Sequence, residues 1–187
     1  MLMRVEDLVV LYSGGADSTL LLRMAESMGK KPFALMIDYG QLHIKELEFA
    51  KKFCDEIKVP YTTVELKNYN VRSGLTTGEK GIYEGVSVYN VPARNSIFLT
   101  IAAGIAESKK IDTVWIGCDY SDRLGLFKDC YQEYFVKVNE MFSIAFSYPI
   151  KVEAPLIGFS KQMVLKMLEK SYNVTTKDLF SGYGQFS

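Results

Sequence analysis

The chain has 187 residues, of which 48% are hydrophobic, so it is long enough to bury one sizeable core. Lysine plus arginine equals aspartate plus glutamate, at 22 each, which leaves no overall charge to attract nucleic acid or an anionic membrane. No apolar run reaches the roughly 20 residues of a membrane span, and the charged amino terminus does not fit a signal peptide. We therefore expect a cytoplasmic protein (in the host cytoplasm if the source is a phage) with no membrane partner and no direct nucleic-acid partner.

The three cysteines, Cys54, Cys118 and Cys130, are widely spaced and form neither a CxxC pair nor a disulfide framework. Nothing in these cysteines alone indicates a zinc site. We interpret Cys118 and Cys130 as small buried residues rather than as nucleophiles.

Short, β-branched apolar runs alternate with longer segments of helical period, which is the pattern of βαβ units. In the first third of the chain this pattern predicts three strands and two helices. The strands are Leu8–Tyr12, Phe33–Ile37 and Tyr61–Leu66, and the helices between them are Ser18–Met28 and Ile44–Ile57. Glycine follows the first helix and proline follows the second, and both residues commonly end helices.

The segment Lys67–Tyr89 carries four glycines and little periodicity, so we expect a long loop. The later elements are a helix from Asn95 to about Glu107, a strand at Thr113–Gly117, a helix from about Cys130 to Ala145, and a helix from Ser160 to about Lys170. The sequence thus predicts an α/β fold with an open, mostly parallel five-stranded sheet and helices on both faces. We expect one domain over residues 1–187, with a short tail from about residue 172.

The aromatic side chains of the predicted helix from about Cys130 to Ala145 recur at helical spacing. They are Tyr131, Tyr134, Phe135 and Phe142. We interpret this cluster as core or as a subunit interface, so a homodimer is one assembly that the helix around Tyr134 allows.

The first strand ends in the residues SGGADS and passes directly into a helix. Backbone N–H groups and the positive end of a helix dipole then meet at one point, which favours an anion. Gly14 and Gly15 allow close approach by a ligand, and Ser13, Ser18 and Thr19 add hydroxyl donors that suit phosphate. The alternative is a tight strand-to-helix turn with an N-capping serine and no ligand.

Asp17 distinguishes this loop from other phosphate-binding loops. The Walker pattern needs a lysine before the Ser/Thr, and the dinucleotide pattern needs a third glycine, and neither is present. A carboxylate beside phosphates is unfavourable unless a divalent cation lies between them, so Asp17 indicates Mg²⁺. The loop resembles the pyrophosphate loop of the N-type ATP pyrophosphatases, which cleave ATP between the α and β phosphates and adenylate an acceptor.

Four further segments resemble the 7-cyano-7-deazaguanine synthase family. "DYGQLHIKELEFA" (Asp38–Ala50) matches its DYGQxHxxE segment, and "VPARNSIFLTIAAGIA" (Val91–Ala106) matches its VPxRN helix start. "IGCDYSDRLGLFKDCYQEYFVKVNEM" (Ile116–Met141) is similar to its glycine-led loop with Asp-Cys, and "APLIGFSKQMVL" (Ala154–Leu165) is similar to its T-P-L segment ending in Ser-Lys. The order of these segments agrees with the family over nearly the whole chain.

This resemblance implies an ATP-dependent ligase that converts 7-carboxy-7-deazaguanine and ammonia to 7-cyano-7-deazaguanine through an adenylated intermediate, in queuosine-type nucleobase biosynthesis. The loop residues would hold the pyrophosphate and Mg²⁺ of ATP; these are Ser13, Gly14, Gly15, Asp17, Ser18 and Thr19. Asp38, Tyr39 and Gly40 would lie near the adenosine.

The resemblance also implies roles for residues outside the loop. Arg94 is a candidate clamp on a phosphate or on the substrate carboxylate, with Asn95 beside it. Lys161 is a candidate to neutralise charge on the α-phosphate, so the expected catalytic residues are Lys161, Arg94 and Asp17. Asp122 and Asp129 are candidates to read the guanine-like edge of the substrate.

Two positions depart from the family pattern. Gly182 stands where the first zinc cysteine of the family would be, and the other zinc cysteines are absent, so we predict that no zinc is bound there. Tyr131 follows Asp-Cys where the family has arginine.

Other functions stay open. A related deazapurine as substrate, an amide product, another adenylating ligase of the superfamily and a catalytically silent nucleotide-binding module all fit the sequence. His43, the only histidine, is more simply a structural or surface group than a general base.

Overall fold

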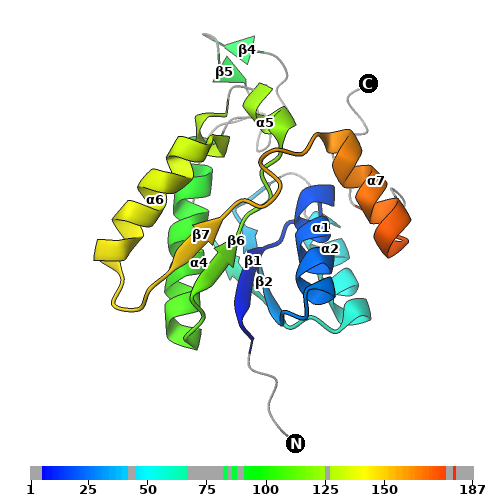
Figure 1. Ribbon diagram of the computed structural model, residues 1–187, viewed down its shortest axis with the longest axis horizontal. Coiled ribbons are helices and arrows are strands. Elements are labelled where there is room, and N and C mark those ends of the chain that lie inside the picture. Colours follow the sequence, from blue (N-terminus) through cyan, green and yellow to red (C-terminus); the bar gives the residue numbers. More distant parts are fainter. Residues whose placement is uncertain are drawn as a thin grey trace, which may run out of the picture.

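The computed structural model describes residues 6–41, 45–66, 82–83, 86–87, 91–124, 127–175 and 179. Its main sheet has five strands in the order β3-β2-β1-β6-β7, and all neighbouring pairs are parallel. The strands are β1 (Leu8–Leu11), β2 (Pro32–Asp38), β3 (Tyr61–Glu65), β6 (Thr113–Trp115) and β7 (Lys151–Glu153). They lie at the centre of the molecule (Figure 1).

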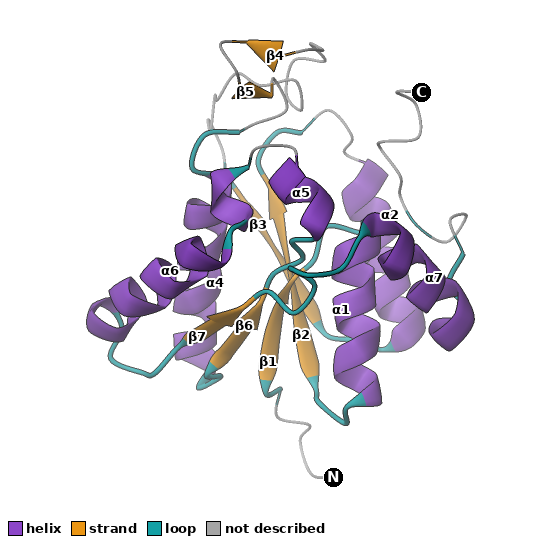
Figure 2. Cartoon of the chain, turned by 45° about the horizontal axis from the view of Figure 1, so that its top comes forward, coloured by secondary structure: helices purple, strands orange, loops and turns teal. Residues whose placement is uncertain are grey.

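Helices cover both faces of the sheet, which confirms the predicted fold class (Figure 2). One face carries α1 (Ala16–Ser27), α2 (Lys45–Ile57) and α7 (Lys161–Tyr172). The other carries α4 (Arg94–Lys109) and α6 (Gln132–Ala145). None of the helices in the described ranges is long and apolar enough to cross a membrane.

The first strand divides its side chains between two hydrophobic clusters. Leu8 and Val10 pack with α1, α2 and α7, whereas Val9 and Leu11 pack with α4 and α6. Because both faces of β1 are covered, every side chain of the strand is apolar and buried. This is why the first apolar run of the sequence shows no alternation with polar residues.

The chain reverses its direction of travel across the sheet between β1 and β6. From β1 it moves through β2 to β3, and it later returns to place β6 and β7 on the opposite side of β1. The loops after β1 and β6 therefore leave the same edge of the sheet in opposite directions. Ligands of open α/β folds bind in the crevice at such a point.

Most predicted elements are confirmed within two or three residues of their expected ends. The sequence predicts five strands but gives residues for only four. The fifth is β7, whose three residues are too few to show a hydrophobic period. The sequence also missed a short helix, α5 (Tyr120–Leu124), and a 3₁₀ turn at Lys128–Cys130. The fourth predicted helix starts at Gln132, after this turn, rather than at Cys130.

Much of the predicted loop Lys67–Tyr89 lies outside the described residues. Within it, the two-residue strands β4 (Ile82–Tyr83) and β5 (Val86–Ser87) pair antiparallel, so the segment is not loop throughout. The single domain over residues 1–187 and the short tail stay predictions.

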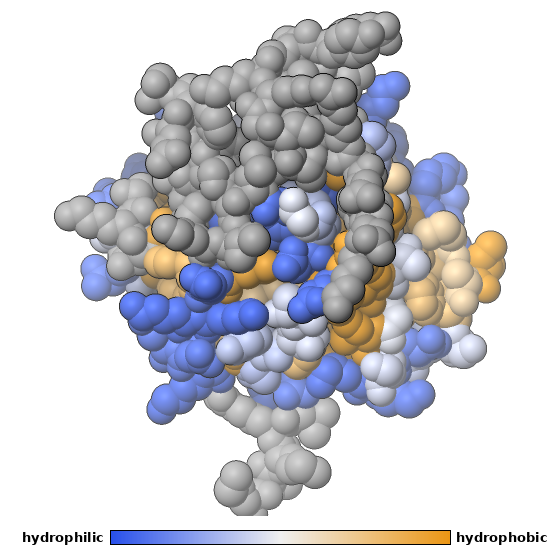
Figure 3. All heavy atoms as spheres, turned by 180° about the vertical axis from the view of Figure 1, so that it is seen from behind, coloured by the Kyte–Doolittle hydropathy of each residue, from blue (hydrophilic) through white to orange (hydrophobic). Residues whose placement is uncertain are grey.

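The aromatic helix α6 contributes mainly to the core. Phe135 and Phe142 are buried, and the hydroxyl of Tyr134 forms a hydrogen bond of 2.9 Å with Ser96. Its outer side exposes apolar residues, of which Ile144 is 88% exposed, and apolar surface gathers at this edge of the molecule (Figure 3). The core interpretation is thus confirmed, and a homodimer through α6 stays a prediction.

The side chain of Asn139 in α6 forms hydrogen bonds with the backbone at the outer edge of β7. Its amide nitrogen donates to the carbonyls of Phe135 and Val152, at 2.9 Å each, and its oxygen accepts the Val152 N–H at 2.7 Å. Val152 thereby finds partners on the side of β7 that faces no further strand.

We expect Asn139→Ala to lower the free energy of unfolding by about 1–3 kcal/mol, because both backbone groups of Val152 lose their partner. Urea denaturation measures the change. Glu140→Ala on the same helix is the control, since its exposed ion pair with Lys137 contributes under about 1 kcal/mol. Equal destabilisation by the two variants would contradict the role of Asn139.

Gly117, which follows β6, packs directly against the amino end of α1. A Cβ atom at Gly117 would lie 3.0 Å from the Asp17 Cβ and 3.1 Å from the Ser18 backbone nitrogen. Gly104 of α4, by contrast, has no such neighbour within 4 Å.

We therefore expect Gly117→Ala to destabilise the protein by about 1–3 kcal/mol, because the α1 amino end must shift to admit the methyl group. Gly104→Ala should instead stabilise it by up to about 1 kcal/mol through helix propensity. Thermal unfolding shows whether each variant is less or more stable than the parent. A stabilised Gly117→Ala protein would show that the contact at Gly117 is not tight.

Candidate functional site

The loop between β1 and α1 is held by its own serines. The Ser13 N–H donates to the Ser18 hydroxyl at 3.2 Å, and the Gly15 N–H donates to the Ser13 hydroxyl at 3.3 Å. Gly14 has a φ of +82°, and a Cβ there would lie 3.2 Å from the Glu46 carbonyl oxygen of α2. Glycine is therefore required at this position for both conformation and space.

No side chain within the described ranges caps the amino end of α1, where Gly15 is the N-cap residue. The N-capping serine of the alternative interpretation is therefore wrong, and a strand-to-helix turn without a ligand stays an open alternative. The N–H groups of the first turn are left to an external acceptor, and the helix dipole adds to the attraction for an anion.

Thr19 differs from the other loop residues. Its side chain is only 1% exposed, its hydroxyl donates to the buried Tyr12 hydroxyl at 3.4 Å, and its N–H donates to the Gly15 carbonyl. Helical spacing turns Thr19 toward the core, so the structure does not place its hydroxyl with the anion-binding groups.

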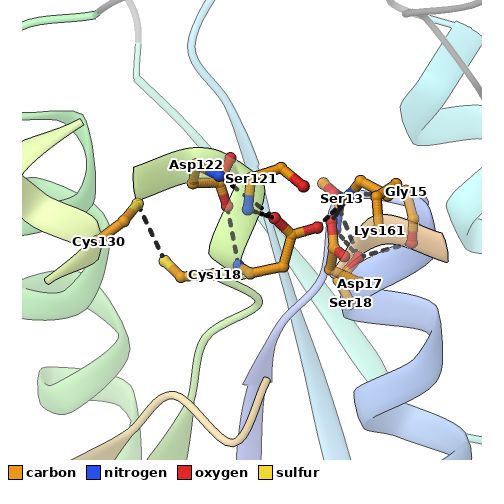
Figure 4. A network of polar contacts seen from close by, with 10 residues as sticks. Ser13, Gly15, Asp17, Ser18, Cys118, Ser121, Asp122, Cys130 and Lys161 are labelled. Carbon is orange, nitrogen blue, oxygen red and sulfur yellow. Dashed lines mark hydrogen bonds and ion pairs between the residues drawn. The ribbon is translucent and has the colours of Figure 1, made fainter. Parts of the chain in front are cut away.

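Lys161, the first residue of α7, brings two carboxylates together at the crevice (Figure 4). Its ammonium group forms ion pairs with Asp17 of α1 and, at 3.0 Å, with Asp119. Ser160 caps α7, since its hydroxyl accepts the Met163 N–H at 3.3 Å, and this confirms the expected helix start.

Sequence reasoning missed Asp119, whose side chain is fully buried in the loop after β6. Its Oδ1 accepts the N–H groups of Ser121 and Asp122, and the next residue, Tyr120, donates its N–H to Phe159 just before α7. A carboxylate shortly after a strand next to β1 was the available signal, because it must lie at the same sheet edge as the SGGADS loop.

The two carboxylates outnumber the single ammonium group, so this cluster carries excess negative charge. Burial raises the pKa of Asp17 to about 6 although Lys161 opposes the shift. Burial also acts on Asp119, but its bonds with Lys161 and Ser121 outweigh that effect and hold its pKa below the usual range. Lys161 has a raised pKa, because Asp17 and Asp119 outweigh its burial.

The same cluster fits a divalent cation. Asp17 Oδ1 is buried and accepts no hydrogen bond from the residues that the structure describes. Carboxylate oxygens are the ligands that Mg²⁺ prefers, and an added cation would compensate the excess negative charge. Asp17 and Asp119 are therefore the residues that could hold Mg²⁺.

The residues predicted near adenosine lie at the end of β2, the strand beside β1. Asp38 Oδ1 accepts the N–H of Gly40 at 3.1 Å, and Gly40 has a φ of +80°. The ring of Tyr39 packs on Phe98 of α4 with 5.4 Å between centroids. These three residues thus form a tight turn at the same sheet edge, and their role stays a prediction.

Arg94 begins α4 directly after Ala93, which adopts a left-handed conformation with a φ of +57°. Such a conformation is strained for alanine and is often kept where it positions a functional residue. The Arg94 charge acts on Glu46 and on Asp122; burial raises the pKa of Glu46 to about 7, and Arg94 opposes that shift. Arg94 is therefore close enough to Glu46 of α2 and Asp122 of α5 to act on both charges.

The remaining predicted residues surround two thiols instead of the phosphate loop. Asn95 is buried and its amide nitrogen lies 3.8 Å from the Cys130 sulfur. Asp122 accepts the Asp119 N–H at 3.0 Å and lies near Cys118 and Cys130, and Asp129 Oδ1 is 4.0 Å from the Cys130 sulfur. His43 and Gly182 lie outside the described residues.

The fold is shared with solved structures of low sequence identity. U34-tRNA thiolase NcsA from Methanococcus maripaludis matches with a TM-score of 0.60 and 20% identity, over 90% of this chain and 58% of that one. NMN synthetase from Francisella tularensis also matches with a TM-score of 0.60, at 17% identity over 95% of this chain and 66% of that one. These likenesses support the N-type ATP pyrophosphatase fold.

Curated relatives are closer. The 7-cyano-7-deazaguanine synthase of Alteromonas mediterranea is 38% identical over 168 residues, which is 86% of this chain and 77% of the relative. That of Picrophilus torridus is 38% identical over 175 residues, covering 87% of this chain and 72% of the relative. The family model of the queuosine biosynthesis protein QueC matches residues 7–185. Because model and relatives both span most of the sequence, the chain belongs to the QueC family.

Proposed function

We propose that this protein converts 7-carboxy-7-deazaguanine and ammonia to 7-cyano-7-deazaguanine with ATP. The observation that carries the proposal is the meeting of Lys161, Asp17 and Asp119 beside an uncapped helix amino end, in a chain of the QueC family. This arrangement combines an anion site, a fixed positive charge and ligands for Mg²⁺ at the crevice of the sheet.

The phosphates of ATP would bind at the amino end of α1. Gly14 and Gly15 let the backbone approach them, and Ser13 and Ser18 supply hydroxyl groups at the mouth of the loop. Mg²⁺, held by Asp17 and Asp119, would neutralise phosphate charge when bound. Lys161 can then turn from the carboxylates to the α-phosphate, whose charge grows as pyrophosphate leaves.

The reaction needs two activations. In the first, a substrate carboxylate oxygen attacks the α-phosphate, pyrophosphate leaves, and ammonia then displaces AMP to give the amide. In the second, the amide oxygen is adenylated in the same way, and loss of AMP and a proton leaves the nitrile. The protein contributes mainly positioning and charge neutralisation.

Arg94 and Asp129 are the proposed substrate contacts. The guanidinium of Arg94, at the start of α4, has the charge and shape to bind a carboxylate or phosphate in two places. Asp129 is partly exposed and can accept hydrogen bonds from the donor-rich edge of a guanine-like base. Asn95 would support this wall of the site from its buried position.

We expect Lys161→Met to lower the rate of AMP formation about 10²–10³-fold, because one charge contact to the reacting phosphate is lost. Lys166→Met, which removes an exposed lysine from the same helix, is the matched control and should retain the parent rate. Chromatographic detection of AMP in the presence of Mg²⁺ measures both. Parent activity in the Lys161 variant would contradict its role.

We expect the nitrile, rather than the amide, as the final product, with one AMP released in each of the two activations. Mass spectrometry of the reaction products distinguishes nitrile from amide. An amide end point would limit the protein to the first activation and direct attention to Tyr131, which replaces the arginine of the family pattern. ATP binding in calorimetry without AMP release would instead favour a silent binding module.

A further inference from the structure

Two buried thiols and a carboxylate lie together on the far side of Asp119 from Lys161. Cys118 is in the loop after β6, Asp122 is in α5, and Cys130 ends the 3₁₀ turn before α6. The sulfur atoms of the cysteines are 3.4 Å apart, and one ligand atom from each of the three residues lies within 4.8 Å of the others. The cluster appears in Figure 4 at the opposite end of the network from the SGGADS loop.

We propose that Cys118, Asp122 and Cys130 form a binding site for a thiophilic divalent cation such as Zn²⁺. Two sulfurs bound to one tetrahedral zinc ion lie about 3.8 Å apart, so the sulfurs need to separate by only a few tenths of an ångström. The carboxylate completes three protein ligands and leaves one position for water or another donor.

The surroundings orient the ligands as metal sites commonly do. The Asp119 N–H donates to Asp122 at 3.0 Å, which fixes one carboxylate oxygen and leaves lone pairs for a cation. The Asn95 amide nitrogen lies 3.8 Å from the Cys130 sulfur, where it can stabilise thiolate charge. Groups that hold metal ligands in this way raise affinity and select the ligand geometry.

The chemistry of the ligands selects the class of cation. Thiolates favour zinc and other soft or borderline ions, whereas Mg²⁺ favours oxygen ligands. This site is therefore distinct from the one proposed at Asp17 and Asp119. Binding of the cation releases the thiol protons, because the thiolate is the form of cysteine that binds metal.

Cobalt is a suitable probe, because thiolate-bound Co²⁺ absorbs in the near ultraviolet. The full chain is reduced, stripped of metal with a chelator and titrated with Co²⁺ without ATP. We expect one ion per chain by native mass spectrometry, a thiolate-to-cobalt absorption band, and displacement of Co²⁺ by Zn²⁺. No binding, or binding without the band, would overturn the proposal.

Variants assign the band to the three residues. Cys118→Ser and Cys130→Ser should each lose the two-thiolate band, whereas Asp122→Asn should keep the band and weaken binding about 10–100-fold. Cys54→Ser is the matched control, because Cys54 is equally buried but packs with the helices on the other face of the sheet. Loss of the band in the Cys54 variant would overturn the assignment.

X-ray absorption at the zinc edge tests the parent protein directly and does not depend on whether a variant folds. Two sulfur ligands together with nitrogen or oxygen ligands would support the site, and a coordination sphere without sulfur would overturn it. A chain that binds no metal and instead loses two hydrogens on mild oxidation would identify the cysteines as a disulfide-forming pair, which also overturns the proposal. AMP formation is measured separately, so this result does not depend on the proposed ligase function.

Discussion

The ammonium group of Lys161 joins three segments that are far apart in the sequence. It pairs with Asp17 at the start of α1 and with Asp119 after β6, while its own backbone begins α7. A buried charge is strongly unfavourable without a partner, so removing Lys161 would leave two carboxylates uncompensated. The relative positions of α1, α7 and the loop after β6 are thus tied to one charge cluster, and that cluster occupies the crevice where the order of strands reverses.

The loop before α1 is held closely in place on both sides. Gly14 lies against α2 and Gly117 lies against Asp17, so the loop after β1 is packed from both sides without side chains of its own in the way. The serines satisfy one another and the backbone of the loop. An anion that binds there meets a preformed site, and little conformational entropy is lost on binding.

Several features could be predicted from the sequence because they depend on local pattern. The buried strands and the helices show a hydrophobic pattern over neighbouring residues, and the SGGADS turn is a contiguous motif. The family resemblance rests on five contiguous segments in order, the SGGADS loop and four others. The three-residue strand β7 and the helix α5 were not found, because such short elements have no period and are stabilised by tertiary contacts such as those of Asn139 with Val152. The sequence predicts Thr19 among the phosphate-binding residues because it follows Ser18, yet helical geometry directs its side chain inward to Tyr12.

The sequence by itself determined the fold class, the SGGADS turn and membership of the QueC family, since each depends on patterns of contiguous residues. Only the tertiary structure decided which charged groups share a site. Asp119 joins Lys161 and Asp17, whereas Asp122 turns toward Cys118 and Cys130. The physical reason is that side-chain direction depends on how strands and helices pack. Two aspartates three residues apart can therefore face different partners, one an ammonium group and the other a pair of thiols.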